Sequence, residues 1–199
     1  MTTVDGVWLV NDIDRARIFV ADDSLRLATG IIDSNPWLCD QVGVQLDVWA
    51  LPLLARHGLT AATLHLVGSA AVGFSLKAEQ PGRPFRRIGG GARPSDLDVA
   101  IVCAPLFDDC WSEMANFDRQ TRWTSDPQDR QAVYWGHIDH QHLPDRAQGR
   151  RKLQTIANEI RKSVAFRDYP CTIRVYRKRS DLMGYVRHSI FVLERSIRP

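Results

Sequence analysis

The chain has 199 residues, of which 44% are hydrophobic and 25% are charged, and its 26 Lys and Arg against 23 Asp and Glu give a formal net charge of +3. A chain of this length and ordinary composition can bury about 70% of its unfolded surface. These figures exclude disordered, collagen-like and disulfide-scaffold proteins, and they predict a single domain over residues 1–199.

Three further patterns narrow the class of protein. The apolar runs are far shorter than the roughly 20 residues that a bilayer requires, so no membrane partner is expected. The first residues lack the positive patch and cleavage site of a secretory leader, which favours a cytoplasmic location. The 4 cysteines are widely spaced and form no C-x-x-C pair, so they predict buried, reduced thiols and not a zinc or redox site.

The N-terminal part of the chain is expected to be helical. Apolar spacing predicts a helix over residues 23–32, and Ser34-Asn35-Pro36 is typical of a cap with proline at the first helical position. The helix that follows should run to about His57, with Pro52 kinking or splitting it. We therefore expect a helical extension over about residues 1–60.

The middle of the chain contains the clearest strands. β-branched and apolar residues predict a buried strand at 63–67, followed by a short helix over 70–77. Glycine and proline make residues 81–94 a loop. The apolar run at 97–102, broken only by Asp98, predicts a second strand, so the core motifs span residues 63–102.

The C-terminal half alternates between helices and one strand. A helix is expected over about 106–117, and residues 124–144 are polar and irregular. Helical spacing predicts a helix over 150–166, a third core strand is expected at about 171–176, and Ser180 caps a last helix. We expect an α/β (α+β) fold in which the three strands are neighbours in a mixed sheet, with helices packed on one face.

Charge is distributed unevenly along the chain. Residues 1–100 hold 9 basic and 11 acidic side chains, whereas residues 150–199 hold 13 basic and 4 acidic ones, a local balance of +9. Such asymmetry indicates a polyanionic partner, either nucleic acid or a triphosphate, and the alternative is a solvated basic face without a partner. An RNA would dock along residues 150–167 and 174–179.

Two short motifs lie where the core strands begin and end. Gly68-Ser69 follows the first strand, where glycine permits close backbone approach to a phosphate and Ser69 adds a hydroxyl donor. Asp96 and Asp98 are two residues apart on the next strand, so both side chains project from one face of the sheet. Such neighbouring carboxylates suit Mg²⁺, which takes one or two carboxylates together with phosphate oxygens.

These motifs resemble the core of the DNA polymerase beta-like nucleotidyltransferases, which carry Gly-Ser at a strand–helix junction and Asp-x-Asp or Glu-x-Asp in the next strand. The matching stretch runs from Leu66 to Val102 and contains LVGSAAVG followed by SDLDVAIV. The resemblance implies a nucleotidyltransferase-like sheet flanked by helices. It also implies an enzyme that moves a nucleoside monophosphate from a nucleoside triphosphate to a hydroxyl of RNA, a protein or a small molecule, by two-metal catalysis with Mg²⁺ or Mn²⁺.

The resemblance also assigns roles to residues. Asp96 and Asp98 would be the catalytic metal ligands, and Gly68 and Ser69 would hold the triphosphate. Lys77, two turns along the expected short helix, is a further candidate for nucleotide binding, and a solvated surface lysine is the alternative.

The loop at 81–94 differs from compact members of the family by its length. It carries Arg87 among several arginines around a triple glycine. Arg87 is therefore a nucleotide-binding candidate on a flap over the triphosphate, and an insertion without a ligand is the alternative.

The third carboxylate of the family, which acts as general base, has no match. The strand at 171–176 holds Arg174 at its centre, and Asp168 and Asp181 only flank it. Two functions stay open: a nucleotidyltransferase without a strong base, or an inactive member of the fold that binds nucleotide, nucleic acid or a protein partner.

Two weaker signals come from histidines and tryptophans. His137, His140 and His142 lie close together and superficially suit a transition metal, although polar loops collect histidines without one. Trp123 and Trp135 are typical of half-buried core residues, with stacking on nucleobases as the alternative.

Overall fold

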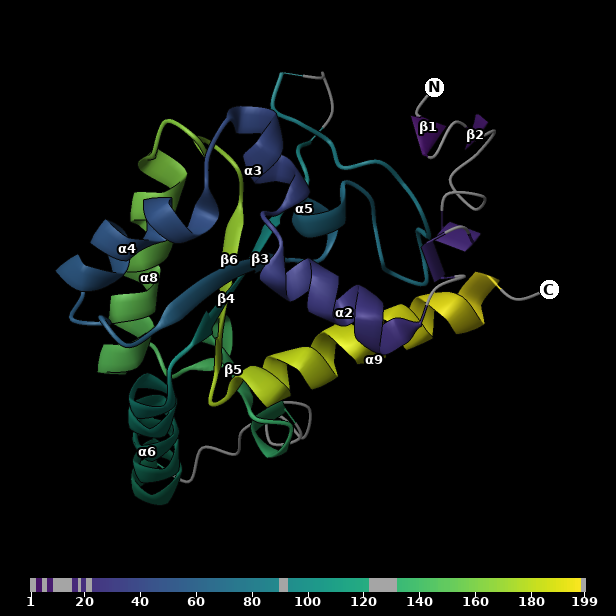
Figure 1. Cartoon of the computed structure of the whole chain (residues 1–199). Coiled ribbons are helices and arrows are strands. Elements are labelled where there is room, and N and C mark those ends of the chain that lie inside the picture. The colour runs from purple at the N-terminus through teal and green to yellow at the C-terminus, as the bar shows by residue number, and fades with distance from the viewer. Residues whose placement is uncertain are drawn as a thin grey trace.

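The computed structural model describes residues 3–4, 7–8, 16–17, 19–20, 23–89, 93–121 and 132–197 (Figure 1). Its helices are α2 (Ser24–Asp33), α3 (Trp37–Val42), α4 (Leu46–Arg56), α5 (Ser69–Val72), α6 (Ala104–Thr121), α8 (Gln148–Lys162) and α9 (Arg179–Ile197), with a short 3-10 turn, η1 (His140–His142). Its strands are β1 (Thr3–Val4), β2 (Val7–Trp8), β3 (Thr63–Val67), β4 (Leu97–Val102), β5 (His137–Asp139) and β6 (Cys171–Tyr176).

Within the described residues, β3, β4, β6 and β5 form one mixed sheet in that order. β3 runs antiparallel to β4, β4 runs parallel to β6, and β6 runs antiparallel to β5. The strands predicted at 63–67, 97–102 and 171–176 are confirmed, and they are neighbours as expected. The predicted α/β class, a mixed sheet flanked by helices, is therefore confirmed.

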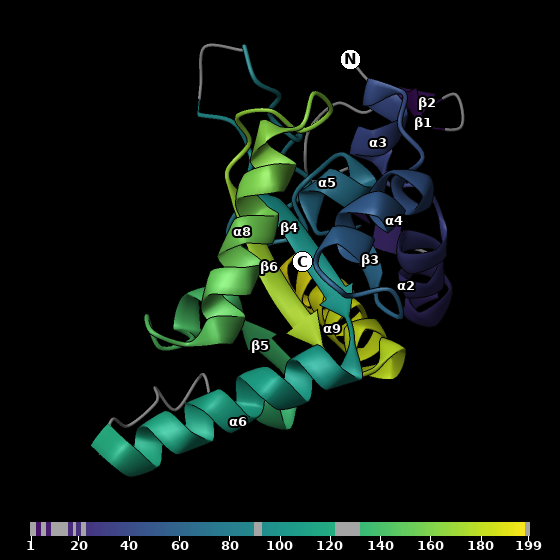
Figure 2. The same ribbon diagram turned by 90° about the vertical axis from the view of Figure 1, so that its left-hand side faces the viewer.

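Different helices cover the two faces of this sheet: in Figure 2, α8 lies in front of β6 and α9 lies behind it. Leu97, Val99 and Ile101 of β4 belong to the larger apolar core, which α4, α6 and α8 close. Ala100 and Tyr176 face the other way and pack with α2 and α9. The expectation of helices on one face is therefore wrong, because strands that are apolar at nearly every position are buried on both faces.

The long helix expected in the N-terminal part is two helices, α3 and α4. The break lies at Gly43, whose φ of 69° is left-handed and ends α3. Asn35 then stabilises the turn: its amide donates to the Val44 carbonyl at 2.9 Å, and its oxygen accepts the Leu46 N–H at 3.0 Å. Pro52, which was expected to kink or split the helix, lies inside α4.

The short helix expected after the first core strand ends after a single turn. Gly73 has a φ of 85°, and a Cβ there would lie 3.0 Å from atoms of the Trp37 ring, so glycine alone fits. The chain then leaves the helix, and Phe74 forms an isolated β-bridge with Pro84. Lys77 consequently lies in a loop, and the prediction of a helix through it is wrong.

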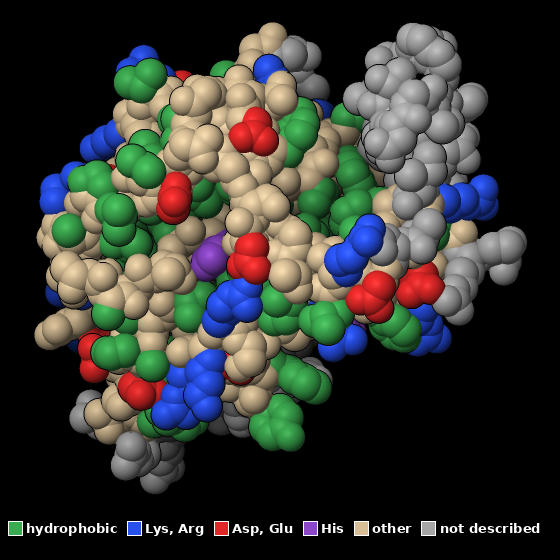
Figure 3. All heavy atoms as spheres, in the orientation of Figure 1, with side chains coloured by type: hydrophobic (Ala, Val, Ile, Leu, Met, Phe, Trp, Pro, Cys, Tyr) green, Lys and Arg blue, Asp and Glu red, His purple; other side chains and the backbone are tan. Residues whose placement is uncertain are grey.

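Three other regions complete the comparison with the sequence. β5 and η1 lie within residues 124–144, which were expected to be irregular, and residues 122–131 are outside the described part. β1 and β2 pair with each other, so the N-terminal extension is not purely helical. Figure 3 shows hydrophobic side chains mixed with charged ones of both signs on the viewed face. Among the described helices, none is long and apolar enough to cross a membrane.

Candidate functional site

The turn after β3 brings the two predicted motifs together. Gly68 has φ 62° and ψ −141°, a conformation that side-chain-bearing residues rarely adopt. A Cβ at this position would lie 3.1 Å from Oδ2 of Asp98. Because Val67 pairs with Asp98 in the antiparallel register of β3 and β4, the Gly68 turn lies directly beside the Asp98 carboxylate.

A cavity of about 640 Å³ opens at this point, and we call it the triphosphate cavity after the ligand that the sequence analysis predicts. Gly68, Ser69, Asp96 and Asp98 all line it. Asp96 is the more accessible acid, with 46% of its side chain exposed against 24% for Asp98. The structure therefore brings together the four residues of the two motifs, although they come from separate parts of the chain.

Basic side chains from the loop between β3 and β4 also line the triphosphate cavity. Lys77, Arg83 and Arg86 all reach it. The Nε–H of Arg86 is buried and has no acceptor in the described part of the chain. The three cations together fit a polyanionic ligand.

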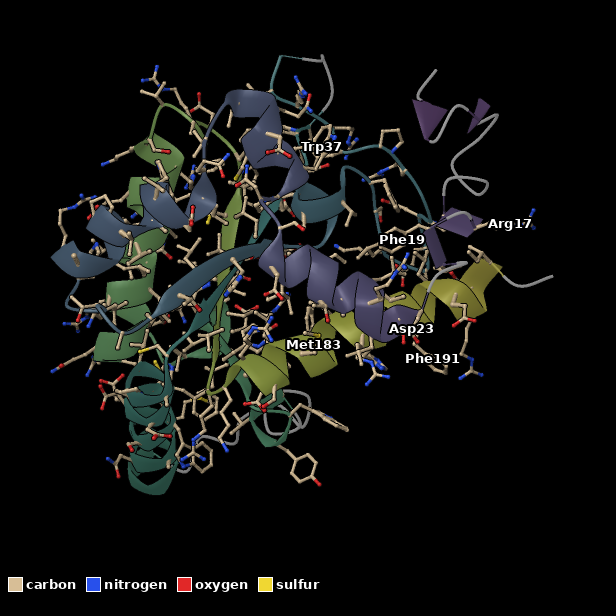
Figure 4. All side chains as sticks on the ribbon, viewed as in Figure 1. Arg17, Phe19, Asp23, Trp37, Met183 and Phe191 are labelled. Carbon is tan, nitrogen blue, oxygen red and sulfur yellow. The ribbon has the colours of Figure 1, made fainter. Side chains whose placement is uncertain are left out.

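Arg87 is the one predicted site residue that the structure places elsewhere. Its guanidinium lies 5.3 Å from the ring centroid of Trp37, which Figure 4 labels on α3. It also donates a hydrogen bond to Gln41. Arg86, and not the predicted Arg87, lines the cavity.

Arg174 occupies the centre of the polar network behind Asp98. Its Nη1 lies 3.7 Å from Oδ1 of Asp98 and donates to the Tyr185 hydroxyl at 2.9 Å. Its Nε lies 3.4 Å from Oδ2 of Asp139. Burial alone would lower the pKa of Arg174, but the negative charges and tyrosines around it raise that pKa above its ordinary value. Arg174 is therefore a permanent cation in the strand where the predicted resemblance called for a carboxylate.

Asp139 is a member of this network that the sequence analysis missed. Burial alone would raise its pKa, but hydrogen bonds from His140 and the Gln141 N–H, together with the Arg174 charge, lower it. Asp139 pairs with Arg174 but does not line the triphosphate cavity. No sequence signal pointed to Asp139, because the 3 residues of β5 are too few to establish an alternating pattern.

The carboxylates of Asp96 and Asp98 fit one divalent cation and not two. Oδ1 of Asp98 already accepts a hydrogen bond from Thr172 Oγ1 at 3.1 Å and faces Arg174. The remaining carboxylate oxygens suit one Mg²⁺ or Mn²⁺ that completes its shell with phosphate oxygens and water. Over the residues that the structure describes, no group of three acidic, histidine or cysteine side chains gathers as a metal site.

The histidine stretch does not form such a group. His140 is buried, and its Nδ1 lies 3.1 Å from the Ile173 amide nitrogen, which donates to it, so this histidine joins η1 to β6. His137 packs against the rings of Tyr176 and Tyr185, and His142 is exposed. The stretch is structural in the described part of the chain.

The cysteines were predicted to be buried, reduced thiols. Cys39, Cys103 and Cys110 are buried and free, as expected, and Cys171 is half-buried. Burial raises the pKa of Cys39, Cys110 and Cys171 to about 12, so these thiols are protonated at neutral pH.

Trp135 is exposed and not part of the core, and Trp123 lies outside the described residues. Asp181 accepts a hydrogen bond from the Lys178 N–H at 3.0 Å and does not line the triphosphate cavity, and neither does Asp168. Neither of these two acids therefore replaces the third carboxylate.

Comparison of the chain with models of protein families, with curated proteins and with solved structures finds no match. The resemblance to nucleotidyltransferases therefore stays a prediction, supported by the geometry of the triphosphate cavity alone.

Proposed function

We propose that this protein is a nucleotidyltransferase that transfers a nucleoside monophosphate from a nucleoside triphosphate to a hydroxyl group. The single observation that carries the proposal is the shared cavity of Gly68, Ser69, Asp96 and Asp98. A polyanion in this cavity would meet the Lys77, Arg83 and Arg86 cations as well as the paired acids. Acids and cations that line one cavity suit a triphosphate that binds together with Mg²⁺ or Mn²⁺.

The residues of the chain would divide the work as follows. Ser69 donates its hydroxyl to a phosphate oxygen, and Gly68 allows the ligand to approach the backbone. Lys77 and Arg86 neutralise the phosphates, while Asp96 and Asp98 hold the cation. A bound Mg²⁺ would polarise the α-phosphate and stabilise charge on the leaving oxygen.

The transfer itself forms one bond and breaks one bond. The acceptor oxygen bonds to the α-phosphorus, the bond from that phosphorus to the bridging oxygen breaks, and pyrophosphate leaves. The hydroxyl proton passes to the imidazole of His188, which lines the triphosphate cavity from α9. We place the reaction in the cytoplasm, where triphosphates and Mg²⁺ are abundant.

Arg174 favours a second function, an inactive member of the fold that binds nucleotide without turning it over. Its guanidinium lies beside Asp98 where the family has its third carboxylate. In that case the cavity would bind a triphosphate, and neither the Asp pair nor His188 would support transfer.

One pair of measurements separates these functions. Calorimetry with each of the four nucleoside triphosphates, with and without Mg²⁺, reports binding. Transfer of label from the α-³²P triphosphate to total RNA or to a protein lysate reports catalysis. The Asp96→Ala, Asp98→Ala double variant is the blank, and Asp109→Ala, an exposed acid on α6, is the matched control.

Each outcome decides between the two functions. Binding with label above the blank supports the transferase, and His188→Ala should then lower transfer by about 10²–10⁴-fold with an unchanged Kd for triphosphate. Binding without label supports the inactive protein. Absence of binding in the wild type contradicts both.

A further inference from the structure

A second cavity, of about 810 Å³, lies between the segment that precedes β5 and the start of α9. Tyr134 and Trp135 line it on one side, and Arg177 and Lys178 line it on the other. We call it the aromatic pocket. The sequence analysis offered Trp135 for stacking on nucleobases and residues 174–179 for RNA docking, but it did not bring the two together, because only the pairing of β5 with β6 places them side by side.

The two sides of the aromatic pocket are fixed relative to each other by the backbone at Gly136. Its carbonyl accepts the Arg177 N–H at 3.0 Å, and its own N–H donates to the Val133 carbonyl at 2.9 Å. Gly136 has a φ of 79°, and a Cβ there would lie 2.5 Å from Oδ2 of Asp181. Only glycine allows this contact, so the aromatic segment is held against the first turn of α9.

The aromatic side chains are presented to solvent. Tyr134 is 83% exposed and Trp135 is 63% exposed. Their ring centroids lie 5.6 Å apart at an interplanar angle of 83°, so each ring supports the other edge to face. Two large rings held in this way offer flat surfaces on which nucleobases stack, and such stacking does not depend on base identity.

The other side of the aromatic pocket is cationic. Lys178 is exposed, and Arg177 lies over the Phe107 ring, 6.0 Å from its centroid, while it pairs with Asp108 at 3.2 Å. Phosphates that follow stacked bases would meet these two cations. His137 also lines the pocket.

The aromatic pocket adjoins the triphosphate cavity. Tyr185 and His188, one turn apart on α9, line both cavities. A strand whose bases stack on Tyr134 and Trp135 therefore has its end directed toward His188 and the α-phosphate. We propose that the aromatic pocket binds the end of a single-stranded nucleic acid, which is the acceptor of the nucleotidyl transfer, so this inference rests on the proposed function.

The test measures binding without catalysis. A fluorescein-labelled single-stranded oligoribonucleotide and its deoxy counterpart are titrated with full-length protein in EDTA, without triphosphate, and anisotropy gives Kd. Trp135→Ala should raise Kd by about 5- to 150-fold, the range expected for one stacked base. Lys178→Ala should weaken binding and reduce the slope of log Kd against log salt by about 0.7, as expected for one lost phosphate contact on a single strand.

Matched controls assign the effect to the pocket. Trp111 is an exposed tryptophan on α6 outside the pocket, and Trp111→Ala should leave Kd unchanged. Lys162, an exposed lysine at the end of α8, tests the part of the suggested RNA surface that lies outside the pocket, residues 150–167. Because Trp135 and Lys178 are exposed, their replacement should leave the melting temperature unchanged, which a thermal scan checks.

The other outcomes overturn the inference or separate it from the proposed function. Absence of oligonucleotide binding in the wild type rejects a nucleic-acid acceptor, even if transfer of label to a protein supports the proposed function. Equal weakening by Trp111→Ala, or loss of binding in Lys162→Ala with Trp135→Ala unaffected, places the nucleic acid elsewhere. Conversely, oligonucleotide binding that depends on Trp135 in a protein that binds no triphosphate would sustain the pocket and reject the transferase.

Discussion

The two faces of the sheet differ in the kinds of side chain that they bury. On the face toward α4, α6 and α8, alternate residues of every core strand are apolar and buried, with Ile173 and Leu97 fully enclosed. On the face toward α2 and α9, the apolar cluster fills only part of the surface, and Asp98, Arg174 and Asp139 extend the face as a charged network.

The two faces therefore contribute differently to the stability of the sheet and to ligand binding. The enclosed face gains hydrophobic free energy from nearly every residue, whereas the charged face loses free energy to desolvation and recovers it through ion pairs. Substitutions on the first face should therefore change stability alone. Substitutions on the second should change stability and ligand binding together.

The largest expected effect is on the enclosed face. Ile173→Ala should lower the free energy of unfolding by about 2–5 kcal/mol, because the cavity it leaves lies between β6 and the helices. Val164→Ala, at a position 90% exposed, is the control and should change it by less than about 0.5 kcal/mol. Chemical denaturation measures both, and a change in triphosphate Kd for folded Ile173→Ala would contradict the separation of the two faces.

The next effect is on the charged network. Arg174→Ala leaves Asp98 and Asp139 without their shared cation, which should cost about 1–3 kcal/mol, less than for a fully buried pair. Arg177→Ala, which breaks an exposed pair with Asp108, should cost at most about 1 kcal/mol.

Reversing the charge at position 174 tests whether Asp96 and Asp98 form a cation site. Arg174→Asp would place a third carboxylate beside Asp98, so Mn²⁺ affinity should rise while stability without metal falls. Unchanged Mn²⁺ affinity would argue against a cation site at Asp96 and Asp98. A rise in transfer activity would identify the missing base as the limit on the rate.

A smaller effect depends on pH. Burial, followed by the Arg174 charge, lowers the pKa of His137 from 6.5 to about 4. As pH falls below 6.5, the His137 imidazole of the unfolded chain takes up a proton while that of the folded protein stays neutral. The free energy of unfolding is therefore unaffected by His137 above pH 6.5 and decreases as pH falls toward 4. His137→Gln should remove roughly 1–2 kcal/mol of that pH dependence. Melting curves between these pH values, with the exposed His142→Gln as control, measure it.

The smallest effect should come from Asp96. Its side chain is 46% exposed and its nearest cation, Arg93, lies 3.9 Å away, so Asp96→Ala should change stability by less than about 0.5 kcal/mol. Triphosphate binding in the presence of Mg²⁺ should nevertheless weaken. A stable variant with wild-type Mg²⁺-dependent binding would remove Asp96 from the site.

The elements that could be predicted from sequence are those with a local signal. β3, β4 and β6 are rich in apolar and β-branched residues, and the motif positions follow from where these strands begin and end. β5 could not be found in this way, because its 3 residues are too few to establish an alternating pattern. The second helical layer was missed since its packing depends on contacts between α2 and α9, which lie far apart in the chain.

The site shows the same limit at the level of single side chains. Gly68, Ser69, Asp96 and Asp98 could be predicted because the backbone of each strand end fixes their direction. Arg86 and Arg87 are adjacent in an irregular loop, where no periodicity tells which side chain enters the cavity. The contact between Arg174 and Asp139 could not be predicted, because it depends on the pairing of β5 with β6, for which the sequence gives no signal.

The order of strands in the sheet has a consequence for biosynthesis. β4 lies between β3, its predecessor in the chain, and β6, which is made only after α6, β5 and α8. At roughly 5–20 residues per second, the ribosome leaves one edge of the apolar β4 strand unpaired for several seconds. A nascent or truncated chain that ends before Cys171 should therefore associate through that edge and aggregate, and chaperone dependence should end abruptly once Tyr176 has emerged.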